Sequence, residues 1–142
     1  MTNLSKELDF LEVTCAVILR EGKLLLAQRA KSGLWELPGG KAEPGETLST
    51  CLARELEEEL AVSAQVGSLL ATQEGLTPEG KPLRLHAFAC RLNGQNPQPL
   101  EHRALAWQEI GLTLGMELCP TDRALLERLK SAGDLDNSTH GW

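Results

Sequence analysis

The chain has 142 residues, of which 42% are hydrophobic, and a net charge of -6 at pH 7. This length suits one domain with its own core, so we expect a single domain over residues 1–142. The acidic balance and the lack of a basic patch argue against long nucleic acid as a partner. No apolar run approaches the roughly 20 residues of a membrane span. The N-terminus does not resemble a signal peptide, so we expect no membrane association and a cytoplasmic location.

The first part of the chain is predicted to form strands. Alternating apolar and strand-forming residues predict strands over 11–19, 24–29 and 34–37. The segment 38–45 is rich in Gly and Pro, so we expect an irregular loop of fixed shape there rather than the interior of a helix or strand.

A helix is predicted after this loop. Leu48, Leu52, Leu56 and Leu60 recur every four residues and form an apolar stripe that would face a core. Thr47 is the expected N-cap, because its hydroxyl can accept a hydrogen bond from the first turn.

The second half of the chain returns to strands and ends in a helix. Strands are predicted over 63–74, 83–91 and 105–110. The last helix is predicted over 121–129, with Pro120 at its start, where the missing N–H costs nothing.

The order of these elements predicts the fold class. Strands, helix, strands and helix imply an α/β domain in which a mixed β-sheet is covered by helices. Its core is expected over about 11–130, and the small, polar residues over 131–142 predict a loose tail. The four cysteines lie far apart in the sequence, so we expect free thiols rather than a zinc site or a disulfide framework.

An acidic run stands on the predicted helix. At about 100° per residue, Glu55, Glu58 and Glu59 share one face and Glu57 points almost opposite. Three carboxylates on one face suit a hard cation such as magnesium or manganese, although exposed acidic helices without a metal are common. Arg54 stands four residues before Glu58 and is placed to pair with it. The Gly/Pro-rich loop leading into the helix favours a bound metal–phosphate over empty solvent.

The spacing of these residues resembles a known signature. Gly40, five residues, Glu46, seven residues and then the run 54–62 look like the box of the Nudix family. That box ends Arg-Glu-apolar-any-Glu-Glu-any-Gly-apolar, and the departure is Ala61 in place of the second Gly. Alanine in the left-handed conformation expected after a helix costs on the order of 1 kcal/mol.

The resemblance covers about residues 11–130 and is greatest to the MutT-like branch. It implies a Nudix-type α/β/α sandwich and a magnesium-dependent enzyme, with manganese as a possible substitute. The implied reaction is hydrolysis of a nucleoside triphosphate to the monophosphate and pyrophosphate. An oxidised purine nucleotide such as 8-oxo-dGTP, or a pyrimidine such as CTP or dCTP, ranks first. ADP-ribose or another substituted nucleoside diphosphate is the runner-up.

An alternative of another class is a nucleotide-sensing module that has lost catalysis. Such modules usually lack some of the box carboxylates, whereas all are present here, so this reading ranks below the enzyme. A small-molecule nucleotide is the expected partner in either case, and the protein is expected to be a monomer or a homodimer.

The resemblance also implies which residues bind the metal. The ligands carried over are the Gly39 carbonyl, Glu55, Glu58, Glu59 and, on a later loop six residues before a tryptophan, Glu101. Glu55 or Glu101 would be the general base, so the expected catalytic residues are Glu55, Glu58, Glu101 and Arg54, the last as the residue that orients the glutamates.

Substrate-binding positions are carried over in the same way. They are Arg29, Glu36, Gly40, Asp122 and Trp35, and Glu46 is expected to support the site. Two of them have a purely structural interpretation as well. Arg29 could be an exposed charge at the end of a strand, and Asp122 could be a residue favoured at a helix N-terminus. Trp35 could stack on a base or belong to the core.

Overall fold

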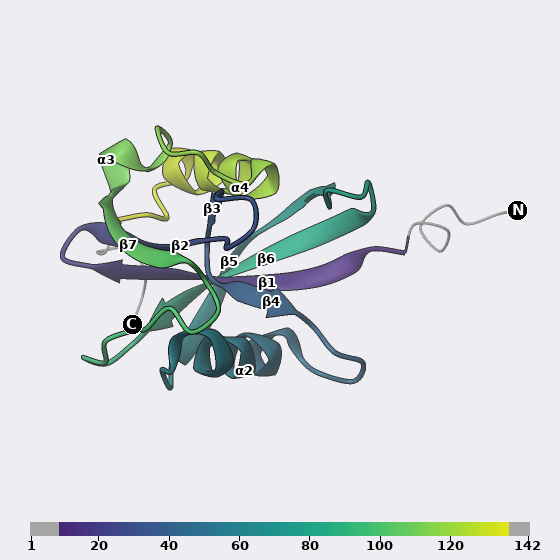
Figure 1. Cartoon of the computed structure of the whole chain (residues 1–142), viewed down its shortest axis with the longest axis horizontal. Coiled ribbons are helices and arrows are strands. Elements are labelled where there is room, and N and C mark those ends of the chain that lie inside the picture. Colours follow the sequence, from purple (N-terminus) through teal and green to yellow (C-terminus); the bar gives the residue numbers. More distant parts are fainter. Residues whose placement is uncertain (1–8, 137–142) are drawn as a thin grey trace, which may run out of the picture.

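The computed structural model describes residues 9–136 and places a mixed, seven-stranded sheet between helices (Figure 1). The strand order is β3-β2-β1-β6-β5, with β4 paired to β1 and β7 paired to β2. The β1–β6 pair is parallel and the other pairs are antiparallel. In chain order the elements are β1 (Leu11–Arg20), β2 (Lys23–Gln28), β3 (Trp35–Glu36), β4 (Gly39–Lys41), α2 (Leu48–Leu60), β5 (Gln65–Leu76), β6 (Pro82–Arg91), β7 (Ala104–Glu109), α3 (Ile110–Thr113) and α4 (Pro120–Ser131).

The predicted α/β fold with a mixed sheet between helices is confirmed. Helices α2 and α4 lie on opposite sides of the sheet in Figure 1. Each helix buries leucines in a separate core cluster: Leu52, Leu56 and Leu60 from α2, and Leu125, Leu126 and Leu129 from α4. No helix among residues 9–136 is long and apolar enough to cross a membrane.

Strand β1 contributes to both clusters, because alternate side chains of a strand point to opposite faces. Cys15 and Val17 belong to the α4-side cluster, and Ala16 and Ile18 belong to the α2-side cluster. All four are almost fully buried. The alternating pattern therefore predicted correctly that one face of β1 is buried. The other face is buried as well, under helix α2.

Strand β1 also has two partners along the same edge. Its first half pairs with β4, from Val13 opposite Lys41 to Cys15 opposite Gly39. Its last residues pair with β2. Between them, the Ala16 N–H donates to the carbonyl of Pro38 over 2.8 Å. This edge of β1 is thus shared between β4 and β2, with a gap between them. Pro38, immediately before Gly39, lies at this gap.

The prediction that segment 38–45 contains no strand was wrong for Gly39–Lys41, which form β4. Glycine makes this pairing possible, because a Cβ on Gly39 would collide with the backbone of Thr14. The short strand β4 forms only by pairing with β1, which is distant in the sequence: Thr14 and Gly40, which are in contact, are 26 residues apart. Local composition therefore gave no signal for it.

Several predicted boundaries also differ. Ile110 begins the short helix α3 instead of ending a strand, and β3 contains only Trp35–Glu36. The loose tail expected from residue 131 is packed as far as Leu135, which is buried with the α4-side cluster. Residues 137–142 of that tail lie outside the described residues.

Both ends of α2 agree with the prediction. The Thr47 hydroxyl accepts a hydrogen bond from the Thr50 N–H at 3.2 Å, so Thr47 is the N-cap. Ala61 follows the helix with φ 58° and ψ 37°, the left-handed conformation expected there. The helix that carries the acidic run therefore begins and ends where its sequence indicates.

Candidate active site

The acidic face of α2 lies against β4. Glu55 and Glu59 are half-buried, while Glu58 and Glu57 are exposed. The Gly39 N–H donates to Oε1 of Glu59 over 3.3 Å, so this carboxylate lies against the residue whose carbonyl is an expected metal ligand.

The second glycine of the pair makes room for Glu55. A Cβ on Gly40 would collide with the Glu55 carboxylate, so a larger residue would displace that side chain. The Gly40 carbonyl accepts a hydrogen bond from the buried Thr14 hydroxyl at 3.2 Å. The absence of a side chain at Gly40 therefore lets the Glu55 carboxylate pack against β4, and β1 holds β4 in place.

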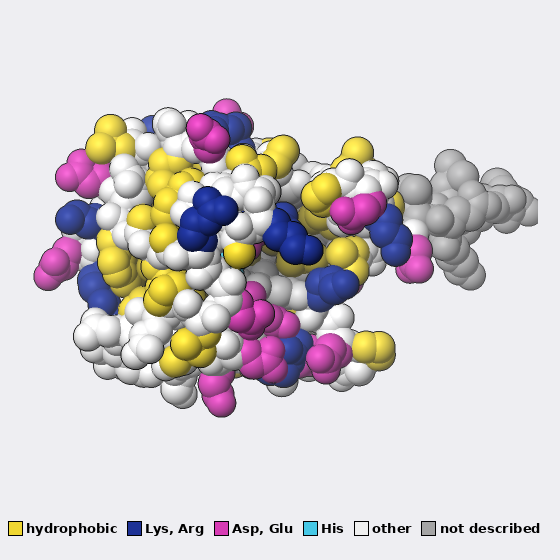
Figure 2. All heavy atoms as spheres, viewed as in Figure 1, with side chains coloured by type: hydrophobic (Ala, Val, Ile, Leu, Met, Phe, Trp, Pro, Cys, Tyr) yellow, Lys and Arg dark blue, Asp and Glu magenta, His cyan; other side chains and the backbone are white. Residues whose placement is uncertain are grey.

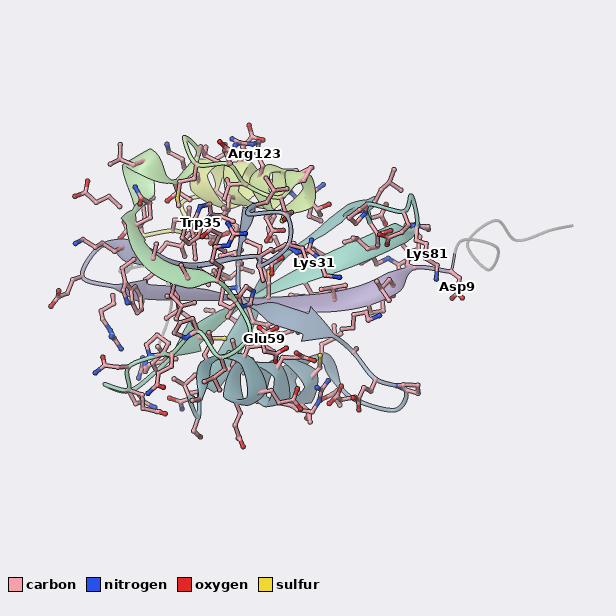
Figure 3. The ribbon with its side chains drawn as sticks, viewed as in Figure 1. Asp9, Lys31, Trp35, Glu59, Lys81 and Arg123 are labelled. Carbon is pink, nitrogen blue, oxygen red and sulfur yellow. The ribbon has the colours of Figure 1, made fainter. Side chains whose placement is uncertain are left out.

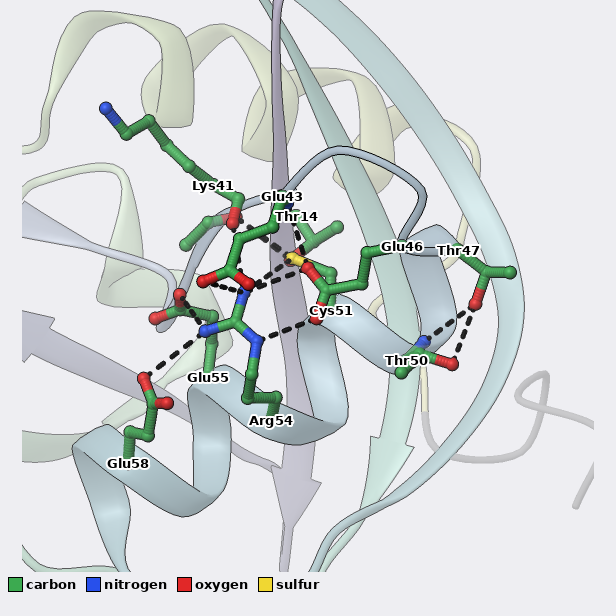
Figure 4. Close-up of polar contacts among 11 residues, drawn as sticks. Thr14, Lys41, Glu43, Glu46, Thr47, Thr50, Cys51, Arg54, Glu55 and Glu58 are labelled. Atoms are coloured by element: carbon green, nitrogen blue, oxygen red, sulfur yellow. Dashed lines mark hydrogen bonds and ion pairs between the residues drawn. The ribbon is translucent and has the colours of Figure 1, made fainter.

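Arg54 holds the carboxylates around it in a network (Figure 4). Its Nε and Nη2 donate to the two oxygens of Glu46 at 2.7 and 3.0 Å. Its Nη1 donates to Glu55 at 2.8 Å and to Glu58 at 3.3 Å. Nη2 also donates to the Lys41 carbonyl at 3.2 Å, which ties the helix to β4. The pairing of Arg54 with Glu58 expected from their spacing is present, and Glu46 takes the larger share of the guanidinium.

The proton affinities of these carboxyls follow from their surroundings. Hydrogen bonds from Arg54 lower the pKa of Glu46 to about 2. Burial raises the pKa of Glu55, against the opposing effect of Arg54. Burial also raises the pKa of Glu59 to about 8, with His102 opposing and Glu55 and Glu36 adding to the rise.

The loop that carries Glu101 is fastened to the end of α2. The Leu100 N–H donates to the Glu59 carbonyl over 3.0 Å, and the Gln98 N–H donates to the Leu60 carbonyl over 2.9 Å. Glu101 is exposed, and its charge is among the causes that raise the pKa of Glu55. The structure therefore places Glu101 near the acidic face of α2.

A second group of predicted residues gathers on the α4 side of the site. Ligand atoms of Glu36, Cys119 and Asp122 all lie within 4.8 Å of one another. Arg29 approaches Glu36, with 3.9 Å between Nε and Oε1. The Leu37 N–H donates to Oδ2 of Asp122 over 2.9 Å. Three of the five expected substrate-binding residues, Arg29, Glu36 and Asp122, are thus brought together.

Trp35 organises this group through its backbone. Its N–H donates to the Glu117 carbonyl, and its carbonyl accepts from the Cys119 N–H, each over 2.8 Å. Its half-buried ring packs against the α4-side cluster. Figure 3 shows Trp35 on the α4 side and Glu59 on the α2 side of the same region. The core reading of Trp35 therefore has direct support in this packing.

Two members of the Glu36–Cys119–Asp122 group, Cys119 and Asp122, hold their protons more tightly than usual. Burial raises the pKa of Asp122 to about 7, although the Leu37 N–H opposes this rise. Burial likewise raises the pKa of the Cys119 thiol to about 11. A protonated thiol is a poor ligand for magnesium, which prefers charged or carbonyl oxygens. This group is better suited to hydrogen bonding with a ligand than to holding a hard cation.

The face of α2 fits a divalent cation better. Figure 2 shows Asp and Glu side chains gathered above α2, with Lys and Arg side chains around them. The expected donors are carboxylate and backbone oxygens. Burial raises the pKa of Glu55 and Glu59, neighbouring carboxylates add to the rise, and a cation would favour the charged form of both. Within residues 9–136 these carboxylates do not form a group as tight as 4.8 Å, since Arg54 and Gly39 draw them toward different partners.

Sequence reasoning missed His102. Its Nε2 lies 2.9 Å from Oε2 of Glu36, and its side chain is only 7% exposed. The hydrogen bond to Glu36 raises the pKa of His102, with Glu59 and Glu101 adding to the effect. The signal available in the sequence was its position directly after Glu101, but the partner lies 66 residues earlier.

Comparisons with known proteins show what the chain is similar to. The NUDIX domain model matches residues 10–130. The chain is 40% identical over 124 residues to a CTP pyrophosphohydrolase of Escherichia coli K12, covering 84% of this chain and 91% of that protein. It is 36% identical over 128 residues to a putative 8-oxo-dGTP diphosphatase 2 of Mycobacterium tuberculosis, covering 82% and 86%.

Solved structures show the same likeness. The solution structure of the E. coli ORF135 protein has a TM-score of 0.80 and 37% identity, covering 94% of this chain and 97% of that one. A MutT protein from Methanosarcina mazei Go1 has a TM-score of 0.78 and 26% identity, covering 87% and 95%. The likeness thus extends over nearly the whole of the described fold.

Proposed function

Because this chain belongs to the NUDIX family of hydrolases, we propose that it hydrolyses a nucleoside triphosphate to the monophosphate and pyrophosphate with magnesium. Enzymes of this family generally use a divalent metal. Magnesium is proposed as that metal, with manganese as a substitute, because the available donors are hard oxygens.

The observation that carries the proposal is the convergence of α2 and β4. The bond from the Gly39 N–H to Glu59 and the fit of Glu55 against Gly40 put two carboxylates of α2 beside the Gly39–Gly40 pair. The residues proposed to hold the metal are the Gly39 carbonyl, Glu55, Glu58, Glu59 and Glu101. When bound, the metal would neutralise phosphate oxygens and lower the pKa of a bound water.

The chain's own residues supply the remaining functions. Glu55 or Glu101 accepts the proton of the attacking water, since both are carboxylates beside the proposed metal position. Arg54 and Glu46 keep Glu55 and Glu58 oriented through the bonds of 2.7–3.3 Å described above. Arg29 is proposed to steady the phosphates from the side of Glu36, where it is half exposed at the end of β2.

The base is proposed to bind at Glu36 and Asp122 and against the part of the half-buried Trp35 ring that the core leaves accessible. Asp122 is buried, and its raised pKa of about 7 lets it donate or accept a hydrogen bond near neutral pH. Glu36 is available as an acceptor beside it. A pair of this kind suits a base edge that carries both an amine and a ring nitrogen or carbonyl, as cytosine and oxidised guanine do. The similar proteins named for CTP and for 8-oxo-dGTP support these two candidates.

The test is turnover of purified protein on CTP, dCTP, 8-oxo-dGTP, the other triphosphates and ADP-ribose, with magnesium or with a chelator, and with products identified. Magnesium-dependent release of pyrophosphate, at much higher kcat/KM for one triphosphate, is the expected result. Activity confined to ADP-ribose would replace the triphosphate reading with the runner-up. Nucleotide binding without hydrolysis would replace it with the sensing module.

Cytoplasmic location and a monomeric or homodimeric state stay predictions. Light scattering of the purified protein tests the second of these.

A further inference from the structure

His102 lies between the two halves of the site. Its ring is buried, with Nε2 on Glu36, and it directly follows Glu101 in the loop that Leu100 fastens to the end of α2. The charges of Glu59 and Glu101 also act on it. The same imidazole is therefore adjacent to the proposed metal ligands and bonded to the proposed base pocket.

The bond to His102 determines how the Glu36 carboxylate is presented. Oε2 is engaged by the ring at 2.9 Å. The other oxygen, Oε1, lies on the side of Cys119 and Arg29, 3.9 Å from both the Cys119 Sγ and the Arg29 Nε. A carboxylate held at one oxygen offers the other as an acceptor in a fixed direction, and this lowers the cost of ordering it when a ligand binds.

The other ring nitrogen carries a second, independent observation. Nδ1 of His102 is buried and has no hydrogen-bond partner within residues 9–136. Buried polar atoms are nearly always satisfied, and one without a protein partner is the kind that a ligand or an ordered water completes. The ring therefore has one nitrogen bonded to Glu36 and one buried nitrogen whose hydrogen-bonding capacity is unused among the described residues.

We propose that His102 is a positioning residue for nucleotide binding, which fixes Glu36 in the base pocket and ties that pocket to the loop of Glu101. The inference rests on the proposed function. It acts on substrate affinity and base choice more than on the hydrolytic step, because the ring contacts Glu36 and none of the expected catalytic residues by a hydrogen bond that the described structure contains.

The chain offers a matched control. His86 is also buried in the sheet region, with a side chain 11% exposed, and its Nε2 lies 2.7 Å from Glu12. Its Nδ1 is bonded to the Thr72 hydroxyl at 2.9 Å. His86→Leu thus removes a similar histidine–carboxylate bond away from the proposed pocket.

The experiment measures kcat and KM of His102→Leu, His102→Gln and His86→Leu on the best substrate of the wild-type protein, after circular dichroism has shown that each is folded. His102→Leu is expected to raise KM about tenfold, the loss that follows from removing a hydrogen bond to a charged group. Its kcat should stay within about twofold. His102→Gln should recover most of the loss because its amide can still donate to Glu36, and His86→Leu should leave KM unchanged.

A double-mutant cycle with Glu36→Gln separates positioning from a general structural effect. If His102 acts through Glu36, His102→Leu adds no further rise in KM when Glu36 is already Gln. Equal rises in both backgrounds, an unchanged KM or a fall in kcat alone would overturn the inference while leaving the proposed function intact.

The proposed function fails in a different way. If wild-type protein binds nucleotide without hydrolysing it, the same variants are compared by Kd in equilibrium dialysis, with the same expected pattern. If wild-type protein neither hydrolyses nor binds any nucleotide, the proposed function and this inference are both overturned.

Discussion

Arg54 and Glu46 are joined by two parallel hydrogen bonds, Nε to Oε2 at 2.7 Å and Nη2 to Oε1 at 3.0 Å. This leaves Nη1 for the carboxylates of Glu55 and Glu58. Glu46 thus sets the direction of the guanidinium, and the guanidinium sets the direction of two expected metal ligands. A bidentate fork has this effect because its geometry is fixed in a plane.

Glu46→Gln is predicted to lower kcat/KM by roughly 10- to 100-fold, the usual cost of losing a partner that orients metal ligands. The control is Glu43→Gln, whose exposed carboxylate is 3.9 Å from Arg54 and should matter little. Steady-state kinetics at saturating magnesium compare them. Equal activity of the Glu46 variant and the wild-type protein would contradict the role of the fork.

Glu58→Gln is predicted to remove most turnover, by about 100-fold or more, while leaving the fold intact. Glu58 is exposed at 54%, so its substitution carries little structural cost, and the loss would come from a missing metal ligand. Glu57→Gln, on the neighbouring exposed position of the same helix, is the control and should keep activity. Near-normal turnover of the Glu58 variant would remove it from the proposed site.

Asp122→Asn is predicted to change how stability depends on pH. The pKa of Asp122 is about 7 in the folded chain against 3.8 for an ordinary aspartate. Between these values the folded state binds more protons than the unfolded state, so the free energy of unfolding falls as pH rises through this range. The Asn variant lacks this fall, so its free energy of unfolding should increase relative to that of the wild-type protein from pH 4 to about 7.

Urea unfolding at a series of pH values measures this difference. Glu127→Gln, an exposed position on the same helix, should follow the wild-type curve. If the Asp122→Asn and wild-type curves stay parallel, the buried carboxyl does not titrate as described.

Ala61→Gly is predicted to stabilise the protein by about 1 kcal/mol, because Ala61 is held at φ 58° and glycine adopts this conformation without steric cost. Ala53→Gly, inside the same helix, should destabilise by about the same amount. Chemical denaturation of both variants tests the sign. A loss of stability in Ala61→Gly would mean that the strain is already relieved.

Magnesium binding is predicted to release a proton from Glu59, whose pKa is raised to about 8 mainly by burial. A cation favours the charged carboxylate, so affinity should increase as pH rises through about 8. Calorimetry at pH 7 in buffers with different heats of ionisation measures the released proton. The Glu59→Gln variant should release fewer protons than the wild-type protein, and a heat independent of the buffer in the wild-type protein would contradict the assignment.

Much of the helix that carries the candidate site could be predicted because its features are local. The N-cap at Thr47, the apolar stripe of α2 and the left-handed Ala61 all follow from residues within a few positions of one another. The helical period alone places Glu55, Glu58 and Glu59 on one face. The mixed sheet between helices followed from the order of elements, since each amphipathic helix must bury its stripe against a sheet.

The tertiary structure decided what depends on distant partners. Gly39–Lys41 form strand β4 because one edge of β1 pairs with β4 in its first half and with β2 at its end. No local sequence pattern predicts such a division. The bond between His102 and Glu36 joins residues 66 positions apart, and that between Leu37 and Asp122 joins residues 85 apart. By itself, the sequence determined the acidic helix and its caps, because those depend on helical periodicity and short-range hydrogen bonds. The group of Glu36, Cys119, Asp122 and His102 exists only where the folded sheet brings β3, the Glu101 loop and α4 together.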